Sequence, residues 1–368
     1  MKKSLLALAI AAVAASSAAS AATVYDKDGS SLDVYGRVQG VLYSAHAVSE
    51  EYNTYDDSSL QATGRLGFNM RTNLTSGIDA FANLEWDVAD GHDNKSFYAR
   101  YAYLGLDFGS YGVLKAGKFE NAVKYVIEAT DIFDDFGAKA ITVDERYDGM
   151  FMYSISNSGF DLNLSFQTAQ DKQPQANYGG ADIDVNHAYA ASVGYTSPDV
   201  LFGPISVKAG YSFIKAQTEY NNDRDNPYKP FVEESKMWAS SISWGNLDSG
   251  LYLAAMYNEL DDKQVKTSLG TGKYSAEGFE TVVGYGFSNG ISLRTGYNHI
   301  HVKISDDKEA TARVIPVYLN YQINPAFNVW TEARFDMNTD KGFGMEKLSI
   351  EGEELYQNVY SIGARYSF

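Results

Sequence analysis

The sequence predicts an all-β protein, a closed antiparallel transmembrane barrel of 16 strands, and three observations favour this fold. Its composition of Tyr 28, Phe 19 and Gly 32 against Pro 7 is typical of strands, because aromatic side chains suit a pleated surface. Apolar and polar residues alternate with a period of two through much of the chain. The connections between these segments are short turns and long polar stretches that follow one another alternately along the chain, as in a barrel with short turns at one end and long loops at the other.

The first residues have the features of a cleaved targeting segment. "MKK" supplies a basic start, "SLLALAIAAVAASSA" an apolar run too short to cross a bilayer, and "ASA" at 19–21 a cleavage site. We expect residues 1–21 to be removed and 22–368 to form one barrel domain, because no linker or change of composition divides the rest. Loss of Lys2 and Lys3 takes the formal net charge from −17 to −19, which argues against a nucleic-acid partner and favours attraction of cations. The absence of cysteine excludes thiol chemistry.

The segments 77–89 and 160–170 show the alternation most clearly. Each places apolar residues on one face and polar residues on the other, as a strand between lipid and water requires. The polar faces are Asp79, Asn83, Glu85 and Asp87 in the first segment, and Asp161, Asn163, Ser165 and Gln167 in the second. Both segments therefore predict two-faced strands.

The connections between these strands fall into two classes. Short turns are predicted at 75–77, 108–112, 156–159, 197–204, 245–250, 288–290 and 324–327. Long polar loops are predicted at 45–59, 90–95, 120–145, 171–186, 216–235, 261–276, 304–311 and 338–354. Their strict alternation gives the even strand number that closes a barrel and leaves no backbone edge unpaired in lipid. The last strand, "NVYSIGARYSF", alternates to an aromatic terminus.

Several motifs carry a resemblance to a known family. "VYDKDGSSLDVYGRVQG" near the start, "GRLGF" at 64–68, "ARYAYLGLDFGSYGVLKAGK" at 99–118 and the terminal Phe368 resemble the trimeric general diffusion porins of Gram-negative outer membranes. The resemblance covers nearly the whole chain after the targeting segment. It implies an outer-membrane homotrimer, in contact with lipid and lipopolysaccharide, that passes ions and small hydrophilic solutes without a cofactor or a reaction.

The resemblance also implies where the channel is narrow. In that family the loop after the fifth strand folds into the barrel and carries acidic residues that face basic residues on the opposite wall. The segment 120–145 occupies that place, although its "DDFGA" lacks the proline and second glycine of the family's turn. The implied acidic positions are Asp131 and Asp135, with Asp134 as an additional acidic neighbour, and the implied basic positions are Arg37, Arg65, Arg100 and Arg146.

Alternation gives an independent orientation for two of these arginines. Arg37 shares a face with Gln39, and Arg65 shares a face with Asn69. Both faces are predicted to line the pore, because an arginine at the lipid midplane costs about 2–4 kcal/mol. The neighbours of Arg100 mix the two kinds of side chain and leave its orientation open.

The acidic loop and the histidines also allow other interpretations. Asp131 and Asp135 could form an acid/base pair, but such pairs are common in solvated acidic loops, and the calcium-loop pattern is absent. His299 and His301 lie at i, i+2 and could chelate a metal, although two ligands are too few for a dependable site. Among the histidines, His187 is the most suitable candidate for the catalytic histidine of a barrel hydrolase. We predict neither a catalytic nor a metal site.

The strand-end aromatic residues also allow two readings, a sugar-binding track or the girdles at the membrane interfaces, and the girdles explain them more economically. They are Tyr98, Tyr103, Tyr195, Tyr211, Phe213, Tyr285, Phe287, Tyr297 and Tyr321. The predicted function is a water-filled, mildly cation-selective channel. The alternatives are a substrate-specific outer-membrane channel and a surface adhesin or receptor barrel.

Overall fold

The computed structural model describes residues 21–45, 57–90, 97–137, 140, 146–175, 181–217, 232–247, 249–267, 270–305, 308–339, 349–350, 353–354 and 357–368. Residues 1–20 of the predicted targeting segment lie outside them, as do 138–139 and 141–145 of the predicted acidic loop. No helix in the described part of the chain is long and apolar enough to cross a membrane.

Strands make up most of the described chain. Those in the first half are β1 (Ala22–Lys27), β2 (Ser30–Tyr43), β3 (Ser59–Thr75), β4 (Ile78–Asp90), β5 (Tyr98–Asp107), β6 (Val113–Glu120), β7 (Arg146–Asn157), β8 (Phe160–Gln167), β9 (Gln170–Gln175) and β10 (Ala181–Val200). Those in the second half are β11 (Gly203–Ala216), β12 (Glu234–Asn246), β13 (Ser249–Thr267), β14 (Gly270–Gly286), β15 (Ile291–Ser305), β16 (Lys308–Asn324), β17 (Phe327–Asp336), β18 (Ser349–Ile350), β19 (Glu353–Glu354) and β20 (Val359–Ser367). The short helices are η1 (Gly109–Tyr111) and α3 (Lys124–Ile127).

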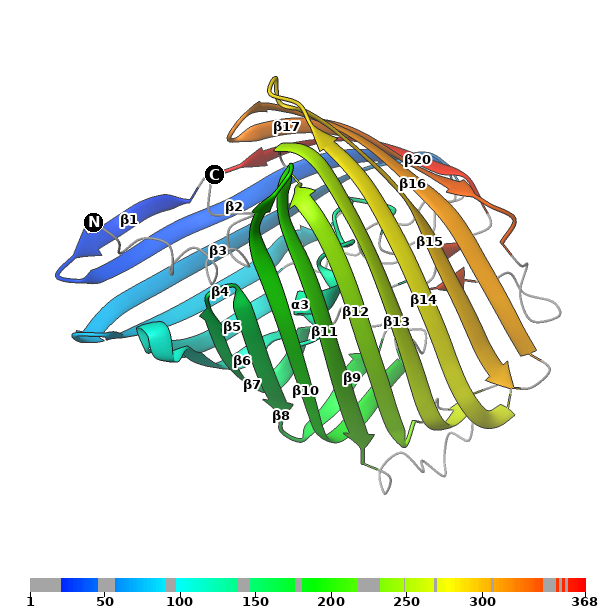
Figure 1. Cartoon of the computed structure of the whole chain (residues 1–368), viewed down its shortest axis with the longest axis horizontal. Helices are drawn as coiled ribbons and strands as arrows, with labels where there is room; N and C mark the ends of the chain where they lie inside the picture. Colours follow the sequence, from blue (N-terminus) through cyan, green and yellow to red (C-terminus); the bar gives the residue numbers. More distant parts are fainter. Residues whose placement is uncertain are drawn as a thin grey trace.

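The main sheet of 18 strands is a closed antiparallel barrel of 16 positions, as the sequence predicts (Figure 1). Two positions are each shared by two strands, because β8 and β9 both pair with β10, and β1 and β20 both pair with β2. The barrel closes where β20 pairs with β2, from Arg37↔Ser367 to Tyr43↔Ser361. The chain end is fixed there too, since the Gly36 N–H donates to the Phe368 carbonyl at 2.8 Å.

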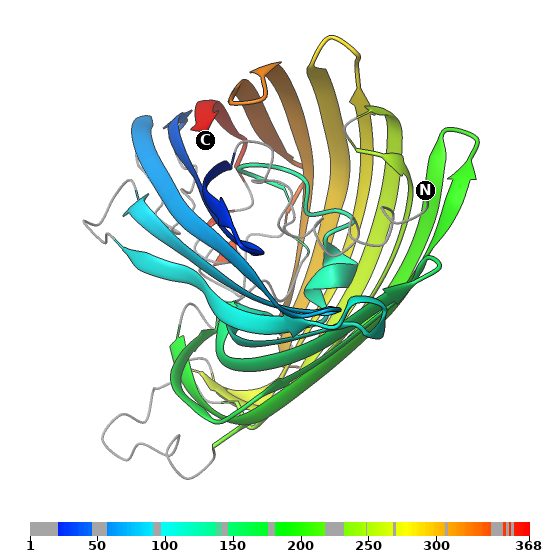
Figure 2. The same ribbon diagram turned by 90° about the vertical axis from the view of Figure 1, so that its left-hand side faces the viewer.

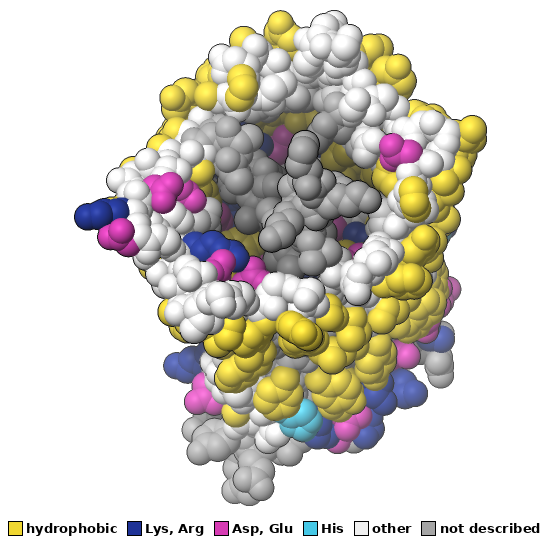
Figure 3. Space-filling view, turned by 60° about the vertical axis from the view of Figure 1, so that its left-hand side comes forward, with side chains coloured by type: hydrophobic (Ala, Val, Ile, Leu, Met, Phe, Trp, Pro, Cys, Tyr) yellow, Lys and Arg dark blue, Asp and Glu magenta, His cyan; other side chains and the backbone are white. Residues whose placement is uncertain are grey.

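The faces of the strands follow the predicted alternation. On β8, Phe160, Leu164 and Phe166 are exposed, whereas the intervening Ser165 and Gln167 are 6% and 1% exposed. Hydrophobic side chains accordingly cover the outer wall, and charged side chains appear on the rim and within the hollow (Figure 3). An apolar outside and a polar inside suit a barrel in lipid.

Three of the predicted long loops are largely strand. The segment 171–186 contains β9 and the start of β10, while β13 and β14 are joined by 268–269 and β15 and β16 by 306–307. The prediction was wrong there because it relied on apolar residues, and these strands continue with polar residues beyond the apolar band. Backbone pairing extends a strand whatever its side chains face.

The described part of the chain starts with a hairpin that the sequence analysis did not predict. Asp28 and Gly29 have φ of 55° and 75°, and they join β1 to β2. Aspartate followed by glycine is a strong signal for such a turn, because both central residues need positive φ. One predicted girdle residue is also placed differently: Tyr103 faces inward and contacts Phe119, with ring centroids 5.7 Å apart.

Candidate functional site

The residues after β6 form the candidate site, and we refer to 121–137 as the 121–137 loop. The Asn121 side chain accepts the Val123 N–H at 2.9 Å, which closes a turn just before the single turn of α3. The chain beyond α3 is irregular. A view into the barrel shows α3 within the ring of strands (Figure 2).

Apolar side chains fix the 121–137 loop to the wall. Val126, Ile127 and Phe136 are 0% exposed and Ile132 is 9% exposed. They pack against inward-facing residues that include Met237 of β12, Tyr252 of β13 and Trp330 of β17. Burial of each such aliphatic or aromatic side chain contributes about 2 kcal/mol, so these residues favour the docked loop.

Polar side chains of successive strands bind the loop backbone. Lys208 of β11 donates to the Tyr125 carbonyl at 3.0 Å, Ser241 of β12 to Val126 at 2.7 Å, Tyr252 of β13 to Ala129 at 2.8 Å, and Arg294 of β15 to Ile132. Further along, the Ala140 N–H donates to Glu280 of β14 at 2.9 Å, and Asn258 of β13 donates to the Ala140 carbonyl at 2.7 Å. The loop therefore follows the inner face of the barrel across many strands.

Glu332 of β17 binds the end of the loop. Its carboxylate accepts the N–H groups of Asp134, Asp135 and Phe136, at 3.0, 2.9 and 2.6 Å. Glu332 is 1% exposed, so these bonds form away from bulk water. A buried N–H group left without an acceptor costs about 1–3 kcal/mol, so one side chain that accepts three of them is a major polar attachment of the loop.

Asp131 and Asp134 each form an ion pair. Asp131 accepts from Lys124 Nζ at 2.6 Å, within the loop itself. Asp134 accepts from Arg365 Nη2 of β20 at 2.7 Å and from the Tyr318 hydroxyl of β16 at 2.6 Å. Burial alone would raise the pKa of Asp134, but the Arg365 charge and these hydrogen bonds, together with the Arg37 charge, lower it below the ordinary value.

Asp135 is held by neutral donors. Its carboxylate accepts from the Tyr43 hydroxyl at 3.0 Å, from Trp330 Nε1 at 2.8 Å and from the Ser361 hydroxyl at 2.5 Å. Burial raises the pKa of Asp135 to about 6, the neighbouring Asp134 charge adds to the shift, and the three hydrogen bonds oppose it. The two adjacent aspartates therefore titrate in different pH ranges.

The four arginines lie on β2, β3, β5 and β7, and those on β3, β5 and β7 bind carboxylates of their own part of the wall. Arg65 Nε is 2.9 Å from Asp87, and Arg100 is 2.8 Å from Glu85 and 3.1 Å from Asp87. Arg146 Nε is 3.2 Å from Glu120 of β6, and its guanidinium lies 4.9 Å from the Tyr101 ring centre. Arg37 is the direct cross-strand neighbour of Arg65.

The structure thus brings Arg37 near Asp134 and places the other three arginines beside Glu85, Asp87 and Glu120. Sequence analysis missed Arg365, Glu332 and Lys124 as partners of the loop. Alternation in the last two long strands could have placed Arg365 and Glu332 on the inner face. It does not say which loop residue each would meet.

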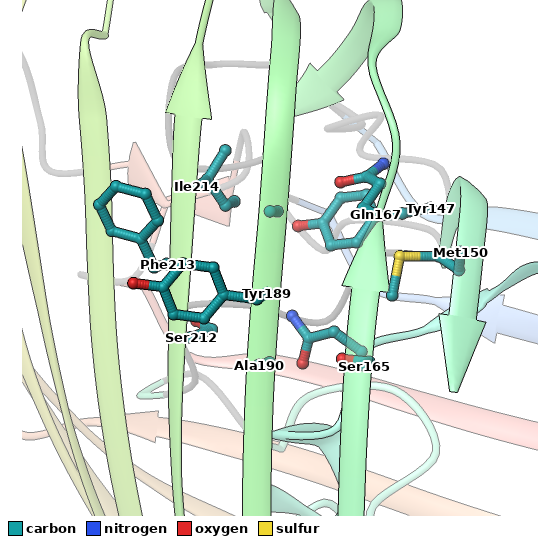
Figure 4. Close-up of a pocket in the computed structure, with 11 residues that line it drawn as sticks. Tyr147, Met150, Ser165, Gln167, Tyr189, Ala190, Ser212, Phe213 and Ile214 are labelled. Carbon is teal, nitrogen blue, oxygen red and sulfur yellow. The ribbon is translucent and has the colours of Figure 1, made fainter. Parts of the chain in front are cut away.

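Two crevices lie in the wall between β5 and β11. One of about 230 Å³ is lined by residues that include Gln167, Ala190 and Ile214, and none of its lining residues is charged (Figure 4). Tyr189 and Phe213 also line it, and their rings stack with centres 5.1 Å apart. The other, of about 390 Å³, is polar and includes Arg146 in its lining.

The histidines make local contacts. His187 Nδ1 lies 2.8 Å from the side-chain oxygen of Asn186, and His301 Nδ1 lies 3.0 Å from the Thr311 hydroxyl. His299 lies 3.5 Å from the Tyr297 hydroxyl. Over the described ranges, no three His, Cys, Asp or Glu side chains are grouped so that they could hold a metal ion.

Known proteins resemble this chain in sequence. Residues 7–341 match the sequence profile of a family described as Gram-negative porin. The chain is 26% identical to outer membrane porin PhoE of Enterobacter cloacae and 26% identical to outer membrane porin F of Salmonella typhi, over 100% of each chain.

Two solved structures resemble the barrel. The Salmonella typhi OmpF complex with daunomycin has a TM-score of 0.72 at 20% identity, covering 94% of this chain and 100% of that one. The anion-selective porin from Comamonas acidovorans has a TM-score of 0.70 at 16% identity, covering 92% of this chain and 100% of that one. At these identities the likeness concerns the fold.

Proposed function

The chain belongs to the Gram-negative porin family, and from that premise we propose that it passes ions and small hydrophilic solutes by passive diffusion. It is a porin, a β-barrel channel of the outer membrane whose strands cross the lipid. We propose that the channel carries out no reaction. The observation that supports a diffusion channel most is the attachment of the 121–137 loop along one side of a closed barrel, opposite a wall of charged side chains.

In this proposal the 121–137 loop sets the size limit of the channel. Asp131, Asp134 and Asp135 stand on one side of the passage and Arg65, Arg100 and Arg146 on the other, whereas Arg37 lies near Asp134. Fixed charges of both signs hold and orient water strongly. An apolar solute would displace that water without replacing its hydrogen bonds, so polar solutes are favoured.

We propose a modest preference for cations. The formal net charge of −17 for the whole chain favours attraction of cations. Within the loop, Asp131 and Asp134 are paired with Lys124 and Arg365, whereas the hydrogen-bond donors on Asp135 are neutral. Asp135 therefore contributes negative charge at neutral pH. The barrel fold does not decide the sign of selectivity, because a protein of similar shape is an anion-selective porin.

We also propose that the protein is a homotrimer in contact with outer-membrane lipid and lipopolysaccharide. Membership of the family supports the trimer, and the apolar outer face of strands such as β8 suits lipid. Single-channel recordings that close in three equal steps would support the trimer. Closure in one step would contradict it.

Liposome swelling tests the channel itself. Liposomes that contain the purified protein should swell in small sugars, at a rate that falls as the sugar becomes larger. Liposomes made with boiled protein serve as the control, since heat unfolds the barrel but leaves the composition unchanged. Swelling no faster than the boiled control would contradict the proposed function and favour a closed barrel with a surface role.

A further inference from the structure

Two carboxylates of β4 lie between the arginines of the neighbouring strands. Glu85 and Asp87 occupy alternate positions on the inner face of β4, together with Asn83. β3 on one side provides Arg65, and β5 on the other provides Arg100. The order across the wall is therefore base, acid, base.

The contacts within this group are close and continuous. Arg65 Nε lies 2.9 Å from Asp87 Oδ1, and Arg100 Nη1 lies 3.1 Å from Asp87 Oδ2. Arg100 Nε lies 2.8 Å from Glu85 Oε1, and the Tyr35 hydroxyl donates to Glu85 Oε2 at 3.1 Å. Asp87 thus bridges two arginines, and Glu85 is held on both of its oxygens.

Partial burial strengthens the effect of these charges. The side chains of Arg65, Asp87, Arg100 and Glu85 are 20%, 20%, 15% and 11% exposed. Charges at such depth are less screened by salt than surface charges, so removal of one partner leaves a field that ions in the passage experience. Arg37, directly opposite Arg65 on β2, adds a further positive charge.

We propose that Glu85 and Asp87 are selectivity-determining residues that cancel the arginine charges of this wall and allow cations to pass. The inference rests on the proposed channel function and assigns one of its properties to β4. With both carboxylates neutral, Arg65 and Arg100 would lose the negative charges that they contact, and this wall would carry a net positive charge toward the passage. The channel then prefers anions.

The test is the reversal potential in a salt gradient across a planar bilayer. The double variant Glu85→Gln/Asp87→Asn should reduce the cation-to-anion permeability ratio by about fivefold or more, to a value below that of equal permeability. Asp87→Asn alone, which leaves the Arg100–Glu85 pair intact, should shift the ratio in the same direction by a smaller factor. This single variant keeps the test available if the double variant does not insert.

Two matched controls separate the local effect from net charge and from packing. Asp79→Asn/Asp107→Asn removes two carboxylates that both bind Arg71, at 2.7 and 2.6 Å, next to the short turns at the other end of the same wall. It should shift the ratio by less than about twofold, because Arg71 is 48% exposed and better screened. Glu85→Asp/Asp87→Glu keeps both charges and should retain the selectivity of the unaltered protein.

The outcomes are distinct. An unchanged ratio in the Glu85→Gln/Asp87→Asn variant overturns the inference, as does an equal shift in the Asp79→Asn/Asp107→Asn control. A shift of the same size in the charge-preserving variant also overturns it, because packing would then be the cause. Absence of conductance from the unaltered protein contradicts the proposed function instead.

Discussion

On strands β2 to β5 the inward-facing charged side chains bind one another, whereas on β11 to β17 they bind the backbone of a distant segment. Arg65, Asp87 and Arg100 illustrate the first arrangement, with each contact between neighbouring strands. Lys208 and Glu332 illustrate the second, with each contact to the 121–137 loop. The same kinds of residue thus serve two purposes in one barrel.

The difference predicts two kinds of variant. On the β2–β5 wall a neutral replacement changes the field in the passage and leaves the path of the chain unchanged. On the β11–β17 wall it removes an attachment of the loop and changes the space available to solutes. Selectivity and size limit can therefore be altered separately.

The largest effect on the size limit is expected from Glu332→Gln. Both carboxyl oxygens accept N–H groups, whereas the amide has one oxygen, so at least one buried N–H loses its acceptor and docking of the loop should weaken by about 1–3 kcal/mol. Larger sugars should enter liposomes, and single-channel current should become noisier. Glu309→Gln is the control, because Glu309 has a side chain that is 62% exposed. An unchanged sugar limit and noise level would show that Glu332 does not hold the loop.

A smaller effect is expected from Gly278→Ala on β14. An added Cβ would lie 1.9 Å from the Ala140 carbonyl oxygen and 2.5 Å from Asn258 Nδ2, so the backbone at Ala140, just beyond the 121–137 loop, must shift. Overpacking of this kind costs about 1–3 kcal/mol. Gly284→Ala is the control on the same strand, because its nearest neighbour would be 3.7 Å away. We expect altered conductance in the first variant alone, and equal conductance in both would contradict a close loop contact at Gly278.

The sequence was sufficient for the barrel and for the faces of its regular strands. Period-two alternation predicts inward positions for Arg37 and Arg65 because β2 and β3 pair without a shift, and the register shift beside Arg65 inserts its extra residue on β4 rather than on β3. Arg100 could not be oriented in this way. One residue is inserted there, since Glu85 pairs with Tyr101 and Trp86 pairs with Ala99, so parity changes at Arg100.

The partners of the acidic loop could not be predicted for a different reason. Asp134 binds Arg365, which lies 231 positions further along the chain. Alternation predicts which face of β20 Arg365 occupies. The loop has no regular secondary structure, so its sequence does not show which loop residue will lie opposite Arg365. Contacts between an irregular segment and a distant strand depend on the packing of the whole barrel.

Arg365 of β20 lies where the β2–β5 wall and the β11–β17 wall meet. The Arg365→Gln variant removes the cation that pairs with Asp134 and leaves the hydrogen bond from Tyr318 to Asp134 in place. The cation-to-anion permeability ratio should rise by about twofold. Arg71→Gln, which removes an arginine next to the short turns, is the control and should change the ratio less. An equal rise in both variants would indicate an effect of net charge.

The smallest expected effect is the pH dependence of Asp135. Its pKa is raised to about 6 by burial, so lowering the pH from about 7 to about 5 neutralises most of its charge and should reduce cation preference by less than about twofold. Asp134, with a lowered pKa, stays charged over this range. Reversal potentials at the two pH values, for the unaltered protein and for Asp135→Asn, measure the change.

The raised pKa of Asp135 also determines whether docking of the loop strengthens or weakens as the pH rises. A carboxyl whose pKa is higher in the docked loop binds more protons there than in the undocked loop between about pH 4 and pH 6. Its contribution to docking is therefore fully present at low pH and is lost as the pH rises through about 6. In the Asp135→Asn variant, the contribution of Asp135 to the pH dependence of docking should disappear. The pH dependence that remains should come from Glu128, because burial also raises the pKa of Glu128. If the variant titrates like the unaltered protein, Asp135 is not the group that takes up the proton, and the titrating group lies elsewhere.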